Sequence, residues 1–204
     1  MVFLLLFMAS SALASTISVG PGAFGAGSTL TTFTGLANGT EVNGLTVDGI
    51  GFSYSLGNGQ VIIDGGPGST NDIGAPNIVS VGNGSGVLTL TLSSFVDTFG
   101  FGYALLNVGP LSNATTISLF NGATSVGSLS YNSTPDPLFS GGFAGIQSTA
   151  AFNIVKLTFD SIDAPAFALD NIRTFSTASS VPEPSTLLLL GTGLGGFLVC
   201  CRRR

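Results

Sequence analysis

The sequences GVLTLTLS at residues 86–93 and TFGFGYALL at residues 98–106 decide the fold class of this chain. In the first, Leu88, Leu90 and Leu92 alternate with threonine and serine, so the leucines project to one face of a strand and the hydroxyls to the other. The second alternates aromatic residues with smaller ones in the same way. This period of two residues predicts half-buried β-strands.

Similar alternations recur along residues 15–177, separated by clusters of Gly, Asn, Ser and Thr. Further predicted strands are residues 44–55, 60–64, 115–121, 125–131, 152–160 and 166–175. None of this region has the i, i+3, i+4, i+7 spacing of an amphipathic helix. Short strands at roughly 8–12-residue spacing are typical of sandwiches and barrels. We therefore predict one all-β domain, an antiparallel β-sandwich, at residues 15–177.

Glycines within the predicted strands indicate where the sheet departs from regularity. Gly51, Gly100 and Gly102 would weaken their strands unless they mark bulges or places where another part of the chain approaches closely. We therefore expect a curved sheet.

The composition excludes several function classes. Only 7% of the residues are charged, and three of the five basic residues are the last three of the chain. Nucleic-acid binding needs lysine and arginine against phosphates, so it is not expected. The chain has no histidine, which excludes histidine-based catalytic triads and histidine-ligated zinc sites.

The first fourteen residues, MVFLLLFMASSALA, predict a signal peptide. They form an apolar run that ends in small residues, with Ala12 and Ala14 at the spacing that signal peptidase recognises. Cleavage before Ser15 and export of the following domain are expected. The alternative is a buried helix or strand at the start of the domain.

The last 27 residues, 178–204, predict a linker and a membrane anchor. A polar stretch at residues 176–180 precedes an almost wholly apolar segment at residues 187–201, which we predict to be a transmembrane helix. Fifteen residues span only about 22 Å, against about 30 Å of hydrocarbon, so the helix is short. The closing residues Arg202, Arg203 and Arg204 would stop transfer and stay on the cytoplasmic side.

The same segment resembles the PEP-CTERM sorting signal of bacterial surface proteins. The resemblance rests on Pro182, Glu183 and Pro184, the apolar helix after them and the terminal arginine cluster. It implies that the triplet is recognised by an exosortase-type membrane protease and that the protein passes from the inner membrane to the cell surface. It also implies an exopolysaccharide or biofilm setting. A plain single-span anchor that is never cut is the alternative.

A second resemblance concerns the exported domain. Residues 38–54, 143–146 and 167–172 resemble parts of the jelly-roll domains that often precede this sorting signal. Those domains are similar to carbohydrate-binding modules, so the resemblance implies a jelly-roll-like sandwich.

Carboxylates in the exported domain suggest a calcium site. Nine of them accompany one lysine and one arginine there. Asp160, Asp163, Asp170 and Asn171 lie closest in sequence, and calcium prefers oxygen ligands. In the alternative interpretation, Asp163 belongs to a turn and Asn171 bonds to loop backbone.

Sugar binding usually needs an aromatic platform, and the chain has no tryptophan. We select Tyr131, which precedes a predicted loop, as a candidate glycan contact; a core tyrosine is the alternative. No nucleophile elbow or phosphate-binding loop is present. An enzyme would have to use carboxylates, serines or the lone lysine, and a two-carboxylate glycoside hydrolase using Glu41 and an aspartate is compatible with the composition.

The sequence therefore predicts a non-enzymatic, exported bacterial surface protein, anchored at least transiently in the inner membrane and then delivered to the envelope, outer surface or extracellular matrix. The expected role is structural or adhesive, in an exopolysaccharide or biofilm matrix. Polysaccharide and the exosortase are the expected partners. A calcium-braced carbohydrate-binding module is the first alternative, and the carboxylate glycoside hydrolase is the second.

Overall fold

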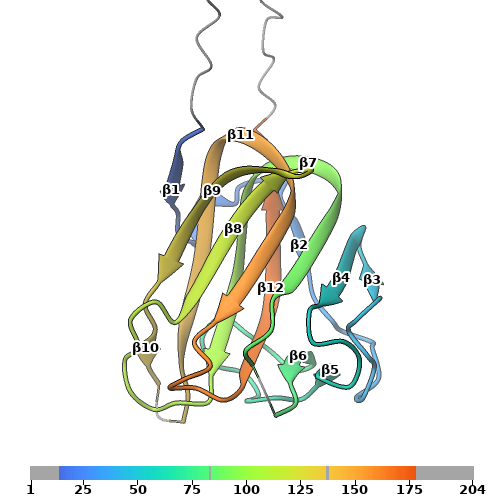
Figure 1. The fold of residues 1–204 in the computed structure, drawn as a ribbon, viewed down its shortest axis with the longest axis vertical. Helices are drawn as coiled ribbons and strands as arrows, with labels where there is room; N and C mark the ends of the chain where they lie inside the picture. The colour runs from blue at the N-terminus through green and yellow to red at the C-terminus, as the bar shows by residue number, and fades with distance from the viewer. Residues whose placement is uncertain (1–13, 83, 137, 178–204) are drawn as a thin grey trace, which may run out of the picture.

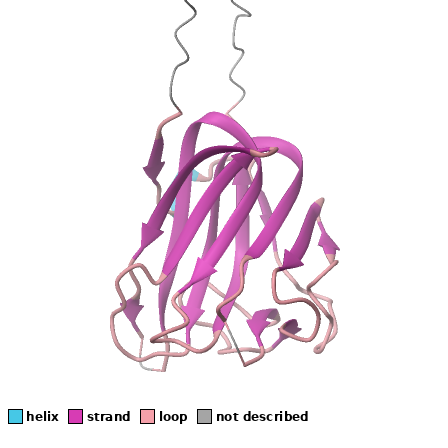
Figure 2. Ribbon diagram, viewed as in Figure 1, coloured by secondary structure: helices cyan, strands magenta, loops and turns pink. Residues whose placement is uncertain are grey.

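The computed structural model describes residues 14–82, 84–136 and 138–177, which form an antiparallel all-β domain (Figures 1 and 2). The elements are β1 (Thr16–Ser18), the 3-10 turn η1 (Pro21–Ala23), β2 (Thr29–Thr31), β3 (Thr46–Val47), β4 (Ile50–Tyr54), β5 (Val61–Asp64), β6 (Asn77–Ser80), β7 (Leu88–Leu105), β8 (Thr115–Asn121), β9 (Thr124–Tyr131), β10 (Thr134–Pro135), β11 (Ser140–Phe159) and β12 (Phe167–Phe175). The predicted signal peptide, apart from Ala14, and the predicted helix at residues 187–201 lie outside the described residues. Within those residues, no helix has the length and apolar character needed to cross a membrane.

Two long strands, β7 and β11, run through both halves of the domain. The strand order is β5-β6-β12-β7-β11-β8-β9. The first part of β7 pairs with β4, whereas its second part, from Thr98 onward, pairs with β12. The pairing of β7 with β11 is interrupted between Gln147 and Phe152, where both strands bend. The bends produce two layers: β5, β6 and β12 lie in one, the β12 layer, and β4, β8 and β9 lie in the other. This arrangement is consistent with a β-sandwich.

The main core contains the inward-facing residues of both layers. Leu88 and Leu90, which the sequence pattern placed on one face, are fully buried in it. Phe101 is also fully buried, and its ring lies 6.2 Å from the Phe159 ring in a T-shaped arrangement. The alternation seen in the sequence therefore separates core positions from the outer faces.

Glycines in β7 allow close approach on the outer face of the β12 layer. A β-carbon added at Gly100 would lie 2.5 Å from the Phe143 ring. One added at Gly102 would lie 2.1 Å from the backbone oxygen of Asp72. The expected close approach is confirmed at both positions, because neighbouring groups occupy the space of a side chain.

Both ends of the described domain lie at the end where β7 and β11 bend (Figure 1). The backbone nitrogen of Ser15 donates to Thr149 Oγ1 at 3.0 Å. The backbone nitrogen of Thr177 donates to Asp97 Oδ2 at 2.8 Å. We call this the terminal end. The opposite end, the loop end, contains the connections at residues 106–114 and 160–166.

Local alternation predicted most of the longer strands but not their continuity. The strand at residues 115–121 has the predicted bounds. The strands predicted at residues 86–93 and 98–106 overlap two parts of β7, at residues 88–93 and 98–105. The strand predicted at residues 152–160 overlaps the second part of β11, at residues 152–159. The strand predicted at residues 44–55 is wrong as a single element, because a turn with positive φ at Asp48 and Gly49 divides it. Four short strands were not predicted: β1, β2, β6 and β10.

Candidate functional site

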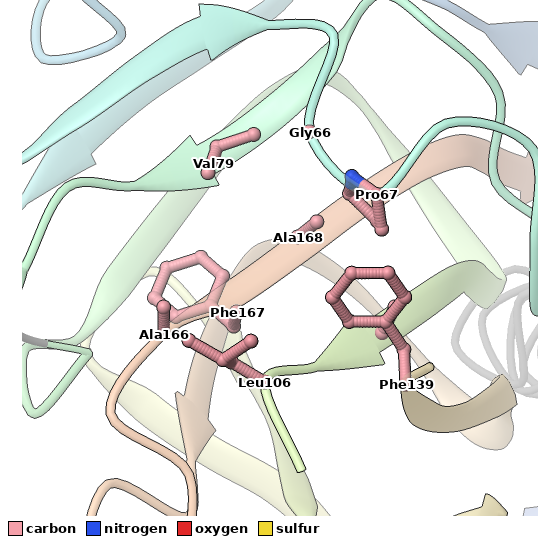
Figure 3. A pocket seen from close by; sticks show the side chains of 9 residues that line it. Gly66, Pro67, Val79, Leu106, Phe139, Ala166, Phe167 and Ala168 are labelled. Atoms are coloured by element: carbon pink, nitrogen blue, oxygen red, sulfur yellow. The ribbon is translucent and has the colours of Figure 1, made fainter. Parts of the chain in front are cut away.

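An open, mainly apolar cavity of about 250 Å³ lies against the outer face of the β12 layer, toward the loop end (Figure 3). Ala104 of β7 and Ala168 of β12, which are directly paired, belong to its lining. The remaining lining residues are Gly66, Pro67, Val79, Leu106, Phe139, Ala166 and Phe167. The cavity therefore combines strand residues with residues from four separate loops.

Strand alternation explains why a hollow forms here. The residues next to the two alanines, Leu105 and Leu169, are fully buried in the main core. The alternate positions, Ala104 and Ala168, face outward and carry only a methyl group. Bulkier side chains stand around them, including Phe139 and the half-exposed Leu106. Small side chains on two neighbouring strands thus leave space that the surrounding loops enclose.

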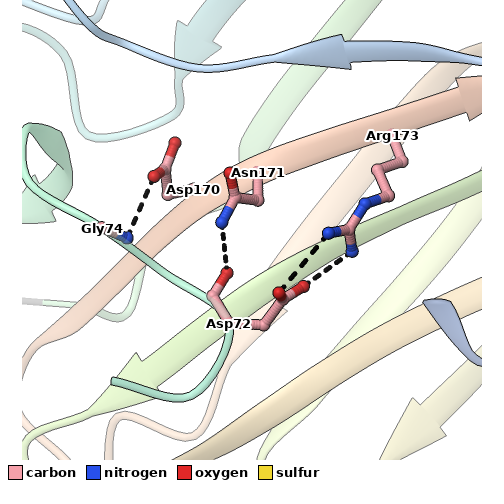
Figure 4. A network of polar contacts seen from close by, with 5 residues as sticks. All are labelled: Asp72, Gly74, Asp170, Asn171 and Arg173. Atoms are coloured by element: carbon pink, nitrogen blue, oxygen red, sulfur yellow. Dashed lines mark hydrogen bonds and ion pairs between the residues drawn. The ribbon is translucent and has the colours of Figure 1, made fainter. Parts of the chain in front are cut away.

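The loop at residues 65–76, between β5 and β6, carries Gly66 and Pro67 of the cavity and is bonded to the sheet (Figure 4). Asp170 Oδ2 accepts a hydrogen bond from the Gly74 backbone nitrogen at 3.1 Å. Arg173 Nη1 lies 2.7 Å from Asp72 Oδ2 in an ion pair. These contacts hold the loop against β12.

Asp170 and Asn77 form a buried polar pair beneath this loop. The register that pairs Leu169 with Ile78 places these two residues opposite each other on β12 and β6. Asn77 Nδ2 donates to the backbone oxygen of Gly74 at 2.9 Å, so both side chains bond to the same loop residue. Asn77 Oδ1 and Asp170 Oδ1 are buried without a hydrogen-bond partner.

Burial raises the pKa of the Asp170 carboxyl above its ordinary value. Hydrogen bonds from the backbone nitrogens of Asn171 and Gly74 oppose this rise, and the negative charge of Asp72 adds to it. A protonated Asp170 would offer a donor beside the unpaired oxygen of Asn77. The environment therefore makes the neutral acid more favourable than it is in water.

Replacing Asp170 with asparagine is expected to raise the free energy of unfolding at neutral pH by about 1 kcal/mol, because the amide keeps an acceptor for Gly74 and adds a donor. The pKa of the Asp170 carboxyl is higher in the folded protein than in the unfolded chain, where it is about 3.9. The contribution of this carboxyl to the free energy of unfolding is therefore complete below the unfolded pKa and is lost as the pH rises through the folded pKa. The advantage of the variant should therefore shrink toward pH 4. Urea denaturation between pH 4 and pH 8 measures it, with Asp170→Ala as the control lacking both groups. A wild-type protein that gains stability over the variant as pH rises would contradict this assignment.

No positively charged side chain lines the cavity. Among the described residues, Lys156 lies over the Phe120 ring in the layer that contains β8, and Arg173 is paired with Asp72. An acidic residue belongs to a loop next to the cavity instead. The backbone nitrogen of Asp136 donates to the carbonyl oxygen of Phe139 at 2.7 Å, so this acidic residue adjoins a cavity wall. The electrostatic surroundings therefore disfavour an anionic ligand.

The predicted calcium residues have separate partners in the structure. Asp160 Oδ1 accepts hydrogen bonds from the backbone nitrogens of Ile162 and Asp163, which makes it a turn residue. Asn171 Nδ2 donates to the backbone oxygen of Asp72, as the alternative interpretation expected of this side chain. In the described part of the chain, no three or more acidic, cysteine or histidine residues are grouped so as to hold a metal. Calcium binding by Asp160, Asp163, Asp170 and Asn171 stays a prediction.

Tyr131, the predicted glycan contact, does not present a free platform. It is partly buried against the main core, and its hydroxyl donates to the backbone oxygen of Gly145 at 2.6 Å. Burial raises its pKa to about 12. Two phenylalanines, Phe139 and Phe167, line the open cavity, and sequence reasoning missed both because phenylalanine is by default a core residue.

The sorting-signal residues Pro182, Glu183 and Pro184, the stop-transfer residues Arg202 to Arg204, and Ala12 of the predicted cleavage site lie outside the described residues. Comparison with protein families matches residues 180–204 to the PEP-CTERM protein-sorting motif. The chain thus carries this motif, which marks an exported protein that is handled by the membrane-associated exosortase and directed to the cell surface.

No curated protein matches the chain. Among solved structures, a mutant of a family 29 carbohydrate-binding module is similar at 11% identity, covering 78% of this chain and 99% of that one, with a TM-score of 0.42. Another structure of a family 29 module covers 78% and 97% at 11% identity, with a TM-score of 0.38. The catalytic domain of a GH87 alpha-1,3-glucanase covers 67% and 30% at 13% identity, with a TM-score of 0.35. Likenesses this distant establish neither a ligand nor an activity.

Proposed function

We propose that this chain is a non-catalytic surface protein whose β domain has a structural or adhesive role in an exopolysaccharide or biofilm matrix, after the membrane anchor has been processed by an exosortase-type protease. The observation that carries the proposal is the PEP-CTERM motif at residues 180–204, which begins three residues after the described domain ends at Thr177.

The geometry of the domain supports this role. The nine residues from 178 to 186 precede the predicted helix at residues 187–201 and can span at most roughly 32 Å, so the terminal end stays within that distance of the membrane while the tail is anchored. The nine residues of β12 extend about 30 Å from there toward the loop end. The cavity, which is lined by Phe167 and Ala168 from the start of β12, therefore lies toward the end of the domain that is distant from the anchor.

The alternative of a calcium-braced carbohydrate-binding module is favoured by one observation, the buried Asp170 Oδ1 without a partner. A calcium ion beside this oxygen would need an ionised Asp170. In that case Asp170→Asn would lower the free energy of unfolding in calcium and have no such effect with a chelator. Comparing the two conditions separates a bound calcium ion from a protonated carboxyl.

Mass spectrometry of the mature protein from its own host tests the processing. We expect a carboxyl terminus at or near Pro184. A combined Pro182→Ala, Glu183→Gln and Pro184→Ala variant should keep Arg204 and stay in the membrane fraction, because it lacks the extended triplet. Pro21→Ala, in η1 of the exported domain, is the control and should be processed as usual. An intact Arg204 in the wild-type surface protein would contradict processing.

A further inference from the structure

We propose that the cavity at the loop end binds an acyl-substituted neutral polysaccharide, with the apolar substituent, such as an acetyl group, inserted between Phe139 and Leu106 and above Ala104 and Ala168. This inference rests on the proposed matrix role and names the class of glycan that the domain would contact.

The lining determines which part of a polysaccharide can enter. Its side chains are apolar throughout: alanine, valine, leucine, proline and phenylalanine. The hydroxyl groups of an unsubstituted sugar ring would lose hydrogen bonds to water there without gaining side-chain partners, which disfavours their entry. The methyl group of an acyl substituent has no hydrogen bonds to lose and gains from leaving water.

The size of the cavity agrees with a small apolar group. Its volume is about 250 Å³, and an apolar cavity of about 150 Å³ is enough to hold benzene. It is therefore too small for several sugar residues but large enough for acetyl substituents with the adjoining edge of one ring. The rest of the polymer would lie outside.

Exposed apolar side chains around the loop end provide a surface for the part of the polysaccharide that lies outside the cavity. Leu106 is 53% exposed, Val108 69% and Ile162 93%. Their loops are joined, since Asn107 Nδ2 donates to the backbone oxygen of Asp163 at 2.8 Å. Leu138, 71% exposed, precedes Phe139 of the cavity. Apolar exposure at the edge of a concave site indicates a binding surface rather than a solvent-facing loop.

Charge restricts the polymer to a neutral one. Two acidic residues are joined to the surrounding loops through their backbones: Asp136 to Phe139, and Asp163 to Asn107 of the Leu106 loop. Neither lysine nor arginine occurs in the lining. Uronic-acid polymers would be repelled, and an anionic membrane surface would find no basic residues with which to pair.

A matched pair of polymers tests the proposal. Full-length protein in lipid nanodiscs is titrated with acetylated glucomannan and with the same glucomannan after mild alkaline deacetylation. We expect at least about tenfold tighter binding of the acetylated polymer, because only this form carries the groups that fill the cavity. Equal binding of both polymers, or no binding of either, would overturn the assignment.

Two variants locate the binding. Ala168→Leu fills the cavity and Leu106→Ala removes one wall, so each should weaken binding of the acetylated polymer by at least about fivefold. Leu30→Ala is the matched control, because Leu30 is 52% exposed but lies on β2, outside the lining. Circular dichroism verifies that each variant is folded. Unchanged binding by both folded cavity variants would overturn the proposal.

Other occupants give distinguishable results. Binding to anionic lipid vesicles that is lost in Leu106→Ala would assign the surface to a membrane, and cavity-dependent dimerisation in sedimentation experiments would assign it to a second copy. Either result replaces the polysaccharide. The proposed function fails separately, through unprocessed tails in the mass spectra, because glycan binding by the nanodisc protein does not require processing.

Discussion

Replacing Phe101 with alanine is expected to lower the free energy of unfolding by about 3–5 kcal/mol, the largest stability change among the variants considered. The Phe101 side chain is fully buried, and its ring neighbours Phe99, Tyr103 and Phe159 at centroid distances of 5.9, 6.0 and 6.2 Å. Because these rings come from both β7 and β11, local collapse cannot readily fill the space that the ring leaves. Urea denaturation followed by circular dichroism measures the change.

Phe95→Ala is the control for this experiment. Phe95 lies on the same strand but is 54% exposed, so its removal should change the free energy of unfolding by no more than about 0.5 kcal/mol. Equal effects of the two substitutions would mean that Phe101 is not a core residue and that the assignment of inner and outer faces along β7 is wrong.

Replacing Gly102 with alanine is expected to cost about 3 kcal/mol, at the upper end of the usual range for overpacking. The added β-carbon would lie 2.1 Å from the backbone oxygen of Asp72 and 2.6 Å from its carbonyl carbon. Backbone atoms cannot rotate away as a side chain can, so the loop at residues 65–76 must move. We expect faster amide exchange at Gly74, whose nitrogen is bonded to Asp170, along with the loss of stability.

Gly51→Ala is the matched control, since Gly51 is also in a strand and the nearest atom to its added β-carbon is 3.8 Å away. It should be nearly neutral or slightly stabilising. If Gly102→Ala left amide exchange in the loop unchanged, the loop would not be packed on β7 as described.

The sequence predicts those parts of the fold that depend on neighbours along the chain. The alternation in β7 and β8 requires only that successive side chains face opposite sides of the sheet. The sequence pattern therefore predicts strands in both regions. The bends in β7 and β11 depend on pairing between distant residues, so the alternation alone predicts two separate strands where β7 is one. Short strands such as β6 have too few residues for a recognisable period.

The candidate site illustrates the same limit. Ala104 and Ala168 lie 64 residues apart, and nothing near either one in sequence marks it as part of a cavity. Asp170 was grouped with Asp160 and Asp163 because they are close along the chain, whereas its neighbour in the sheet is Asn77. A pairing register supplies this information, and a single sequence does not.

The single strand that connects the cavity to the tail has a mechanical consequence. β12 begins at Phe167 in the cavity and ends at Phe175, two residues before the described domain ends at Thr177. A load applied by matrix at one end and by an anchor at the other would pull along this strand. The hydrogen bonds of β12 to β7 run across the direction of pull, so they would resist together in shear instead of opening one after another. The domain is thus built to bear tension along its long axis.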